Sequence, residues 1–113
     1  MKKDVTKGHL DLLLLSVLDR APGHGYAVIS ALRDHSDGVF DLPEGSVYPA
    51  LHRLEDLGLL GSVWQPVAGR RRRVYQITEH GTRELQRERS SWQALVTAVN
   101  AVMNAAATRP AVV

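Results

Sequence analysis

An amphipathic segment over residues 45–60, followed ten residues later by four consecutive arginines, constrains the fold of this chain more than any other feature. Its apolar residues recur at helical spacing, which predicts a helix with one buried face. They are Val47, Ala50, Leu51, Leu54 and Leu57. Beyond this helix, residues 62–66 and 73–77 are predicted as strands, with a turn at Ala68 and Gly69 between them. A helix beside a hairpin with a cationic tip suits contact with a polyanion, so DNA binding is the first hypothesis.

Pro49 limits where the helix over residues 45–60 can begin. Proline is well tolerated only in the first helical turn, where its missing N–H has no partner to lose. With Ser46 as the N-cap, Pro49 falls at the third helical position and meets this condition. We therefore predict a helix that begins after Ser46 and stops at Gly58.

Three further helices are predicted from apolar periodicity and capping residues, over residues 6–20, 24–36 and 78–105. Thr6 and Thr78 are the expected N-caps of the first and last of these, and Tyr26 belongs to the expected inward stripe of the second. The order is helix, helix, helix, strand, strand, helix. The chain is therefore predicted to be mostly α with a small β-hairpin (α+β): a winged helix-turn-helix with a long C-terminal dimerisation helix.

The last predicted helix carries an apolar seam that needs a partner helix. Its residues are Leu85, Trp92, Leu95, Val96, Val99 and Met103. The expected domain division is residues 1–77 as the DNA-binding domain, 78–107 as the dimerisation helix and 108–113 as a flexible tail.

Composition excludes several classes of function. The net charge is only +2, but residues 61–76 hold four arginines and no acid, so the positive charge is concentrated at one tip. The absence of cysteine excludes disulfides, thiolate catalysis and zinc fingers, and fits a cytoplasmic location. The leucine-rich run over residues 12–18 is too short to span a bilayer. Neither metal-ligand histidine spacing nor a pairing of nucleophile and base is present, so we expect no metal, no cofactor and no enzymatic activity.

Five short motifs together resemble one family. They are Gly8-His9-Leu10-Asp11, His24-Gly25-Tyr26, the run from Gly45 to Glu55, Gly58-Leu59-Leu60 and the run from Tyr75 to Gly81. This succession resembles PadR-type transcriptional regulators, and the short C-terminal region is similar to the small PadR subfamily with one dimerisation helix. The resemblance implies a homodimer that mostly represses transcription, binds a palindromic promoter site and often responds to a small molecule. A wing tip made entirely of arginine departs from the more mixed tip of many relatives.

The predicted DNA contacts lie at the start of the third helix and on the wing. They are Lys7, Ser46, Tyr48, Pro49, His52, Arg53, Arg70, Arg71, Arg72 and Arg73. Ser46 and Tyr48 are expected to reach the major groove. Alternatively, Ser46 only caps its helix and Tyr48 only packs against Leu42 or Phe40. Arg53 either contacts phosphate or pairs with Glu55, Asp56 or a wing residue. In the arginine run, Arg71 and Arg72 are the first candidates for phosphate or minor-groove contacts, followed by Arg70.

Trp92 has two interpretations. It is a dimer-core residue, or, as the small PadR subfamily implies, two copies of it form flat apolar walls for a small aromatic effector. Two other functions remain open for the whole chain. The uniform arginine tip also fits a non-specific architectural DNA-binding protein, and the seam also fits a dimeric protein-interaction module.

Overall fold

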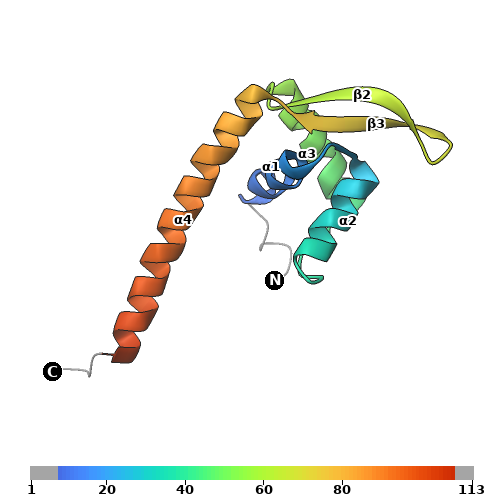
Figure 1. Ribbon diagram of the computed structural model, residues 1–113. Helices are drawn as coiled ribbons and strands as arrows, with labels where there is room; N and C mark the ends of the chain where they lie inside the picture. The colour runs from blue at the N-terminus through green and yellow to red at the C-terminus, as the bar shows by residue number, and fades with distance from the viewer. Residues whose placement is uncertain (1–7, 109–113) are drawn as a thin grey trace.

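The computed structural model describes residues 8–108 (Figure 1). Four helices and a three-stranded antiparallel sheet follow one another along the chain. The elements are α1 (Leu10–Arg20), β1 (Gly23–His24), α2 (Gly25–His35), α3 (Glu44–Asp56), β2 (Leu60–Val67), β3 (Arg70–Ile77) and α4 (Glu79–Thr108). The hairpin of β2 and β3 projects from one side of the three-helix body, and α4 leads away on the other (Figure 1). The predicted class, mostly helical with a winged hairpin, is confirmed.

The core lies where α1, α2 and α3 meet the base of the sheet. Its buried side chains are Leu14, Leu15, Leu18, Val28, Ile29, Leu32, Val47, Ala50, Leu51, Leu54, Leu59, Leu60, Tyr75 and Leu85. Four of the five predicted apolar positions of α3 belong to this core. Leu57 does not, because α3 ends at Asp56 and leaves the Leu57 side chain exposed.

The start of α3 differs from the prediction. Pro43 is the N-cap, and its carbonyl accepts hydrogen bonds from the N–H groups of Ser46 and Val47 at 3.0 and 3.2 Å. Ser46 therefore lies inside the helix, and the prediction that it caps α3 is wrong. Pro49 falls at the sixth helical position, which removes one hydrogen bond to the carbonyl of Gly45. Both residues are exposed, so that carbonyl remains open to water.

The sheet has one strand more than the predicted two-stranded ribbon. The two residues of β1 pair with β3 in antiparallel register, Gly23 opposite Tyr75 and His24 opposite Val74. The sheet order is β1-β3-β2, so β3 is central. A strand of two residues is too short to show alternation in a sequence. Its effect is to attach the base of the wing to the N-terminus of α2.

The wing ends in a two-residue turn. Ala68 and Gly69 both have positive φ, 53° and 79°, and they connect the paired residues Val67 and Arg70. Two consecutive residues with positive φ are typical of the hairpin turn whose twist matches that of the flanking strands. The turn fixes the register that places residues 70–73 opposite residues 64–67.

The first turn of α4 is tied to the body. Thr78 accepts a hydrogen bond from the N–H of Gly81 at 3.0 Å and donates one to the carbonyl of Gly58 at 2.7 Å, which confirms the predicted cap. Leu85, one turn further, is only 1% exposed and packs in the core of its own chain. Its assignment to the dimer seam is therefore wrong, because the side chain is already covered.

Several predictions concern the two ends of the chain, where the described residues begin and end. The last helix extends to Thr108, beyond the predicted end. Residues 109–113 of the expected tail lie outside the described residues, as do Thr6 and Lys7. Across residues 8–108, no helix has a stretch both long and apolar enough to cross a membrane.

Candidate nucleic-acid interface

The start of α3 presents polar side chains to solvent and one aromatic side chain at the edge of the core. Ser46, Pro49 and His52 are exposed, while Tyr48 is half-buried. The Tyr48 ring lies edge-on to that of Tyr26 in α2, with 6.2 Å between centroids and an interplanar angle of 87°. Burial is the main cause that raises the pKa of the Tyr48 phenol, so the hydroxyl stays protonated and can donate a hydrogen bond.

Gly25 determines where the Tyr48 ring can lie. A Cβ atom at position 25 would overlap the ring carbons and the hydroxyl of Tyr48. Glycine at the first position of α2 therefore leaves the space that the ring occupies. The Tyr48 ring thus packs against α2 and is still partly exposed, so its contact with DNA stays a prediction.

Three wing arginines carry uncompensated charge. In the described part of the chain, no carboxylate lies within ion-pair distance of Arg70, Arg71 or Arg72. The guanidinium carbon of Arg71 lies 5.6 Å from the ring centroid of Trp64, and that of Arg72 lies 5.3 Å from the ring centroid of Tyr26. Stacking on an aromatic face orients a guanidinium without neutralising it. These arginines remain available to phosphates.

Arg73 is engaged within the protein. Its guanidinium donates to both carboxylate oxygens of Glu55 at 3.2 and 3.3 Å, and its Nε donates to the hydroxyl of Ser62 at 2.8 Å. The alternation of β3 explains this, because Arg73 shares the face of Tyr75 that packs toward α3. The structure does not place Arg73 with the three uncompensated arginines, contrary to the sequence prediction.

Arg53 is also engaged. It donates to the two carboxylate oxygens of Asp11 in α1 at 3.1 and 2.5 Å. These hydrogen bonds raise the pKa of the Arg53 guanidinium. The partner is none of those considered from the sequence, because Asp11 lies 42 residues away and only the packing of α1 against α3 brings the two together. The pair joins α3 to α1 and occupies the side chain expected to contact phosphate.

A groove of about 300 Å³ separates the wing from the helices. It is lined by His24, Gly25, Tyr48, His52, Trp64, Arg71, Arg72, Arg73 and Tyr75. The lining contains three arginines and two histidines but no acidic side chain, so an anion entering it meets favourable charge. His24 itself caps α2, accepting from the N–H of Ala27 at 3.4 Å, and burial followed by the charge of Arg72 lowers its pKa.

Two residues of this face were missed from the sequence. Tyr26 was expected to point inward but is 46% exposed, and a hydrogen bond with Glu44 is the main cause that raises the pKa of its phenol. Trp64, on β2, is exposed and stacks with two arginines. A tryptophan directly opposite an arginine run across a hairpin was the signal available for Trp64.

The outer part of α4 forms a second exposed surface, apolar in character. Its large apolar side chains are Trp92, Leu95, Val99, Val102 and Met103, with Val96 half-buried beside them. The Trp92 ring contacts that of His9 edge-on at 5.1 Å and is 39% exposed. We call this surface the α4 apolar face.

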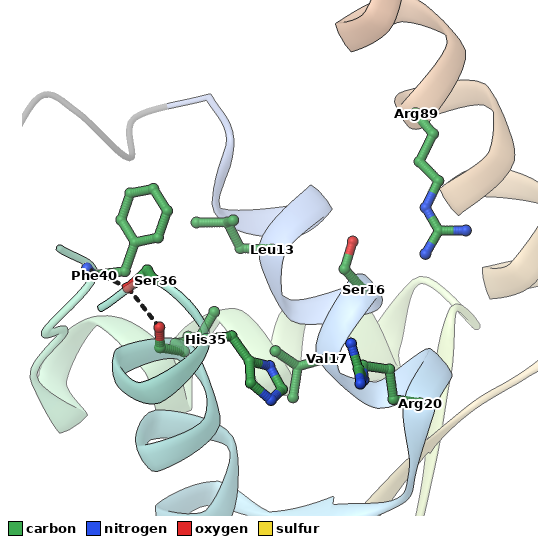
Figure 2. A pocket seen from close by; sticks show the side chains of 9 residues that line it. Leu13, Ser16, Val17, Arg20, His35, Ser36, Phe40 and Arg89 are labelled. Atoms are coloured by element: carbon green, nitrogen blue, oxygen red, sulfur yellow. Dashed lines mark hydrogen bonds between the residues drawn. The ribbon is translucent and has the colours of Figure 1, made fainter. Parts of the chain in front are cut away.

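A cavity of about 270 Å³ lies where α4 passes the helical body (Figure 2). Leu13, Val17 and Phe40 form its apolar part, and Arg89 of α4 faces α1 across it (Figure 2). Arg89 also pairs with Asp19 of α1 at 3.6 Å. None of the residues predicted for an effector pocket lines this cavity. The predicted pocket needs a second copy of α4 to close around Trp92.

Within residues 8–108, no three His, Asp or Glu side chains come together to hold a metal ion.

Comparison with known proteins identifies the family. Residues 14–87 match the transcriptional regulator PadR-like family. The chain belongs to the PadR-like family of transcriptional regulators. The match begins within α1, covers the rest of the winged-helix body and ends in the first turns of α4, so the predicted resemblance is confirmed.

Individual relatives support the same assignment. The chain is 38% identical to transcriptional regulator Rv3488 of Mycobacterium tuberculosis over 76 residues, which cover 67% of this chain and 68% of that protein. A PadR family transcriptional regulator of Eggerthella lenta is similar with a TM-score of 0.77 and 33% identity, covering 88% of this chain and 86% of its own. For a PadR-like regulator of Bacillus cereus, the TM-score is 0.79 at 29% identity, with coverages of 88% and 96%.

Proposed function

We propose that this PadR-like regulator binds double-stranded DNA as a homodimer and represses transcription from a promoter with a palindromic site. The start of α3 enters the major groove, and the wing arginines contact the flanking backbone. A transcriptional regulator acts where the chromosome is, which places it in the cytoplasm. The family consists of transcriptional regulators rather than enzymes.

The observation that carries the proposal is the arrangement of charge around α3. Tyr48 and His52 of α3 line the acid-free groove together with the uncompensated Arg71 and Arg72 of the wing. Ser46 and Pro49 are exposed on the same helix. Base edges are read by side chains in the groove, and phosphates are held by cations beside it. The side chains for reading bases and those for holding phosphates are therefore adjacent on one face of the molecule.

The α4 apolar face supports the homodimer. Its residues recur along one side of a 30-residue helix, and a second copy of the same face matches it in length and chemistry. Pairing through a twofold axis presents two α3 helices to two half-sites about one helical turn of DNA apart. A palindrome of roughly 20–30 bp follows from that geometry.

An aromatic effector is the regulatory part of the proposal. Two half-exposed Trp92 rings facing one another across the dimer axis offer flat apolar walls to a planar ligand. Since Trp64 is the other tryptophan, a Trp64→Phe variant makes fluorescence report Trp92 alone. Quenching by planar aromatic compounds supports the effector, and unchanged emission across a broad panel contradicts it.

DNA binding is tested with the region upstream of the chain's own coding sequence. Fluorescence anisotropy with a labelled fragment that contains an inverted repeat is measured against unlabelled unrelated DNA. We expect at least about 10³-fold preference for the inverted repeat at physiological salt. A preference near one supports the architectural DNA-binding alternative, which the all-arginine wing tip favours. No binding even at low salt supports the protein-interaction alternative.

A further inference from the structure

Arg73 differs from the other three wing arginines in what surrounds it. It is the wing arginine that pairs with a carboxylate among the described residues, and its side chain is 42% exposed against 23% for its partner Glu55. The Ser62 hydroxyl completes the arrangement, donating to Glu55 at 2.6 Å while accepting from Arg73 at 2.8 Å. The three side chains therefore form a closed triangle in which each one contacts the other two.

The triangle connects two separate elements of the DNA-binding face. Glu55 lies in the last turn of α3, and Ser62 and Arg73 lie on the two strands at the base of the wing. Gly23 and His24 pair only with Tyr75 and Val74 of β3, so beyond these residues the wing is a two-stranded ribbon. A contact between α3 and both strands limits the angle of this ribbon further. The triangle fixes the wing at the point where it passes the recognition helix.

Trp64 extends this support toward the wing tip. It lies directly opposite Arg73 in the register, and its ring is 5.7 Å from the Arg73 guanidinium and 5.6 Å from that of Arg71. One arginine of this stack is held by Glu55, while the other has no carboxylate partner in the described chain. The fixed arginine thus sets the position of the ring on which the free arginine rests.

We propose that Glu55 and Arg73 are positioning residues that hold the wing at the angle required for DNA binding, and that Arg70, Arg71 and Arg72 make the phosphate contacts. This inference rests on the proposed DNA-binding function. It assigns a role in binding to an acidic residue that does not contact DNA.

The negative charge of Glu55 allows the positioning role to be tested by the direction in which DNA affinity changes. The Ser62 hydroxyl first, and then Arg73, lower the pKa of Glu55, so the carboxylate is ionised at neutral pH. By charge alone, removing a carboxylate from a DNA-binding face strengthens binding to a polyanion. By positioning, the same change weakens binding because the wing loses its fixed angle. The two effects predict opposite outcomes.

The experiment compares four single variants and one double variant with the wild type on the inverted-repeat fragment across a range of salt concentrations. The single variants are Glu55→Gln, Arg73→Gln, Arg71→Gln and the charge control Arg83→Gln on α4. We expect the first two to weaken binding about three- to tenfold without changing the slope of log affinity against log salt. Arg71→Gln lowers the slope by roughly one unit, because a phosphate contact is lost. The Glu55→Gln/Arg73→Gln double variant weakens binding no more than either single one.

The results distinguish failure of the proposed DNA-binding function from failure of the positioning role. If the wild type binds no DNA, the proposed function fails. If the wild type binds and Glu55→Gln binds more tightly with a steeper slope, Arg73 has become a phosphate contact and the positioning role is wrong. A slope reduced by one unit in Arg73→Gln would likewise contradict the positioning role. Circular dichroism melting confirms that each variant is folded, and Ser62→Ala, which removes only the hydroxyl, repeats the test with a smaller change.

Discussion

The winged-helix body and the outer part of α4 treat their apolar side chains in opposite ways. In the body, Leu14 and Leu51 are fully buried, whereas on α4 Leu95 and Val99 are 51% and 45% exposed. Charged side chains do not divide in this way, since Arg53 in the body and Arg89 on α4 are both paired with carboxylates of their own chain. The body buries its own core, while the α4 apolar face stays exposed in the single chain.

The largest expected effect is a difference in the free energy of unfolding between substitutions in the body and on the outer part of α4. Leu51→Ala removes a fully buried side chain from the centre of α3 and should lower the free energy of unfolding by about 2–5 kcal/mol. Leu95→Ala, measured by urea unfolding at low protein concentration, should lower it by less than about 1 kcal/mol. Equal losses under these conditions would show that the outer part of α4 packs within its own chain.

Val99→Glu tests the α4 apolar face through the dissociation constant of the dimer. A charge placed on the α4 apolar face should raise the dimer dissociation constant at least about thirtyfold, because the carboxylate is desolvated without a partner. Thr97→Glu, an exposed position on another side of the same helix, is the matched control and should change it little. Sedimentation equilibrium measures both. Equal effects of the two substitutions would contradict an interface on this face.

The Glu55 triangle provides a smaller, pH-dependent effect within the body. The lowered pKa of Glu55 means that its ionised form stabilises the fold by up to about 1 kcal/mol, a value limited by partial exposure. This contribution is fully present above the unfolded-state pKa of 4.5 and is lost as the pH falls through the lower folded-state pKa. Unfolding curves of the wild type and Glu55→Gln should therefore differ at neutral pH and converge in acid. A constant difference across this range would exclude the linkage.

The smallest effect concerns the wing turn. Ala68 adopts positive φ at a cost that glycine avoids, so Ala68→Gly should stabilise the protein by about 0.5 kcal/mol after the entropy of glycine is counted. Gly69→Ala, its neighbour in the same turn, should destabilise the protein instead. Thermal melting of the two variants should show shifts of opposite sign, and shifts of the same sign would mean that the turn conformation is wrong.

The fold was predictable because its main signals are local. The apolar stripe of α3 and the Thr78 cap depend on residues within a few positions of one another, and both are present in the structure. The start of α3 was not predictable from Pro49 alone. A proline inside a helix costs about 3 kcal/mol, because a hydrogen bond is lost and the ring crowds the carbonyl four residues earlier. Tertiary packing of α3 outweighs this local preference.

The candidate site was less predictable because its decisive contacts are long-range. The sequence indicated which arginines are concentrated at the wing, but the partners of Arg53 and Arg73 lie 42 and 18 residues away. Leu85 fits the heptad seam as well as any other member, and only the approach of α4 to the body shows that its side chain is already covered. Spacing along one helix cannot distinguish a seam facing its own chain from one facing a partner.

The stoichiometry of the DNA complex tests the central claim most directly, because it joins the α4 apolar face to the recognition face. Sedimentation equilibrium of the protein with a short duplex containing the inverted repeat should give a complex with two 12.4 kDa chains per duplex. Val99→Glu should shift the same mixture toward weak binding of single chains. A wild-type complex saturated at one chain per palindrome would contradict the account.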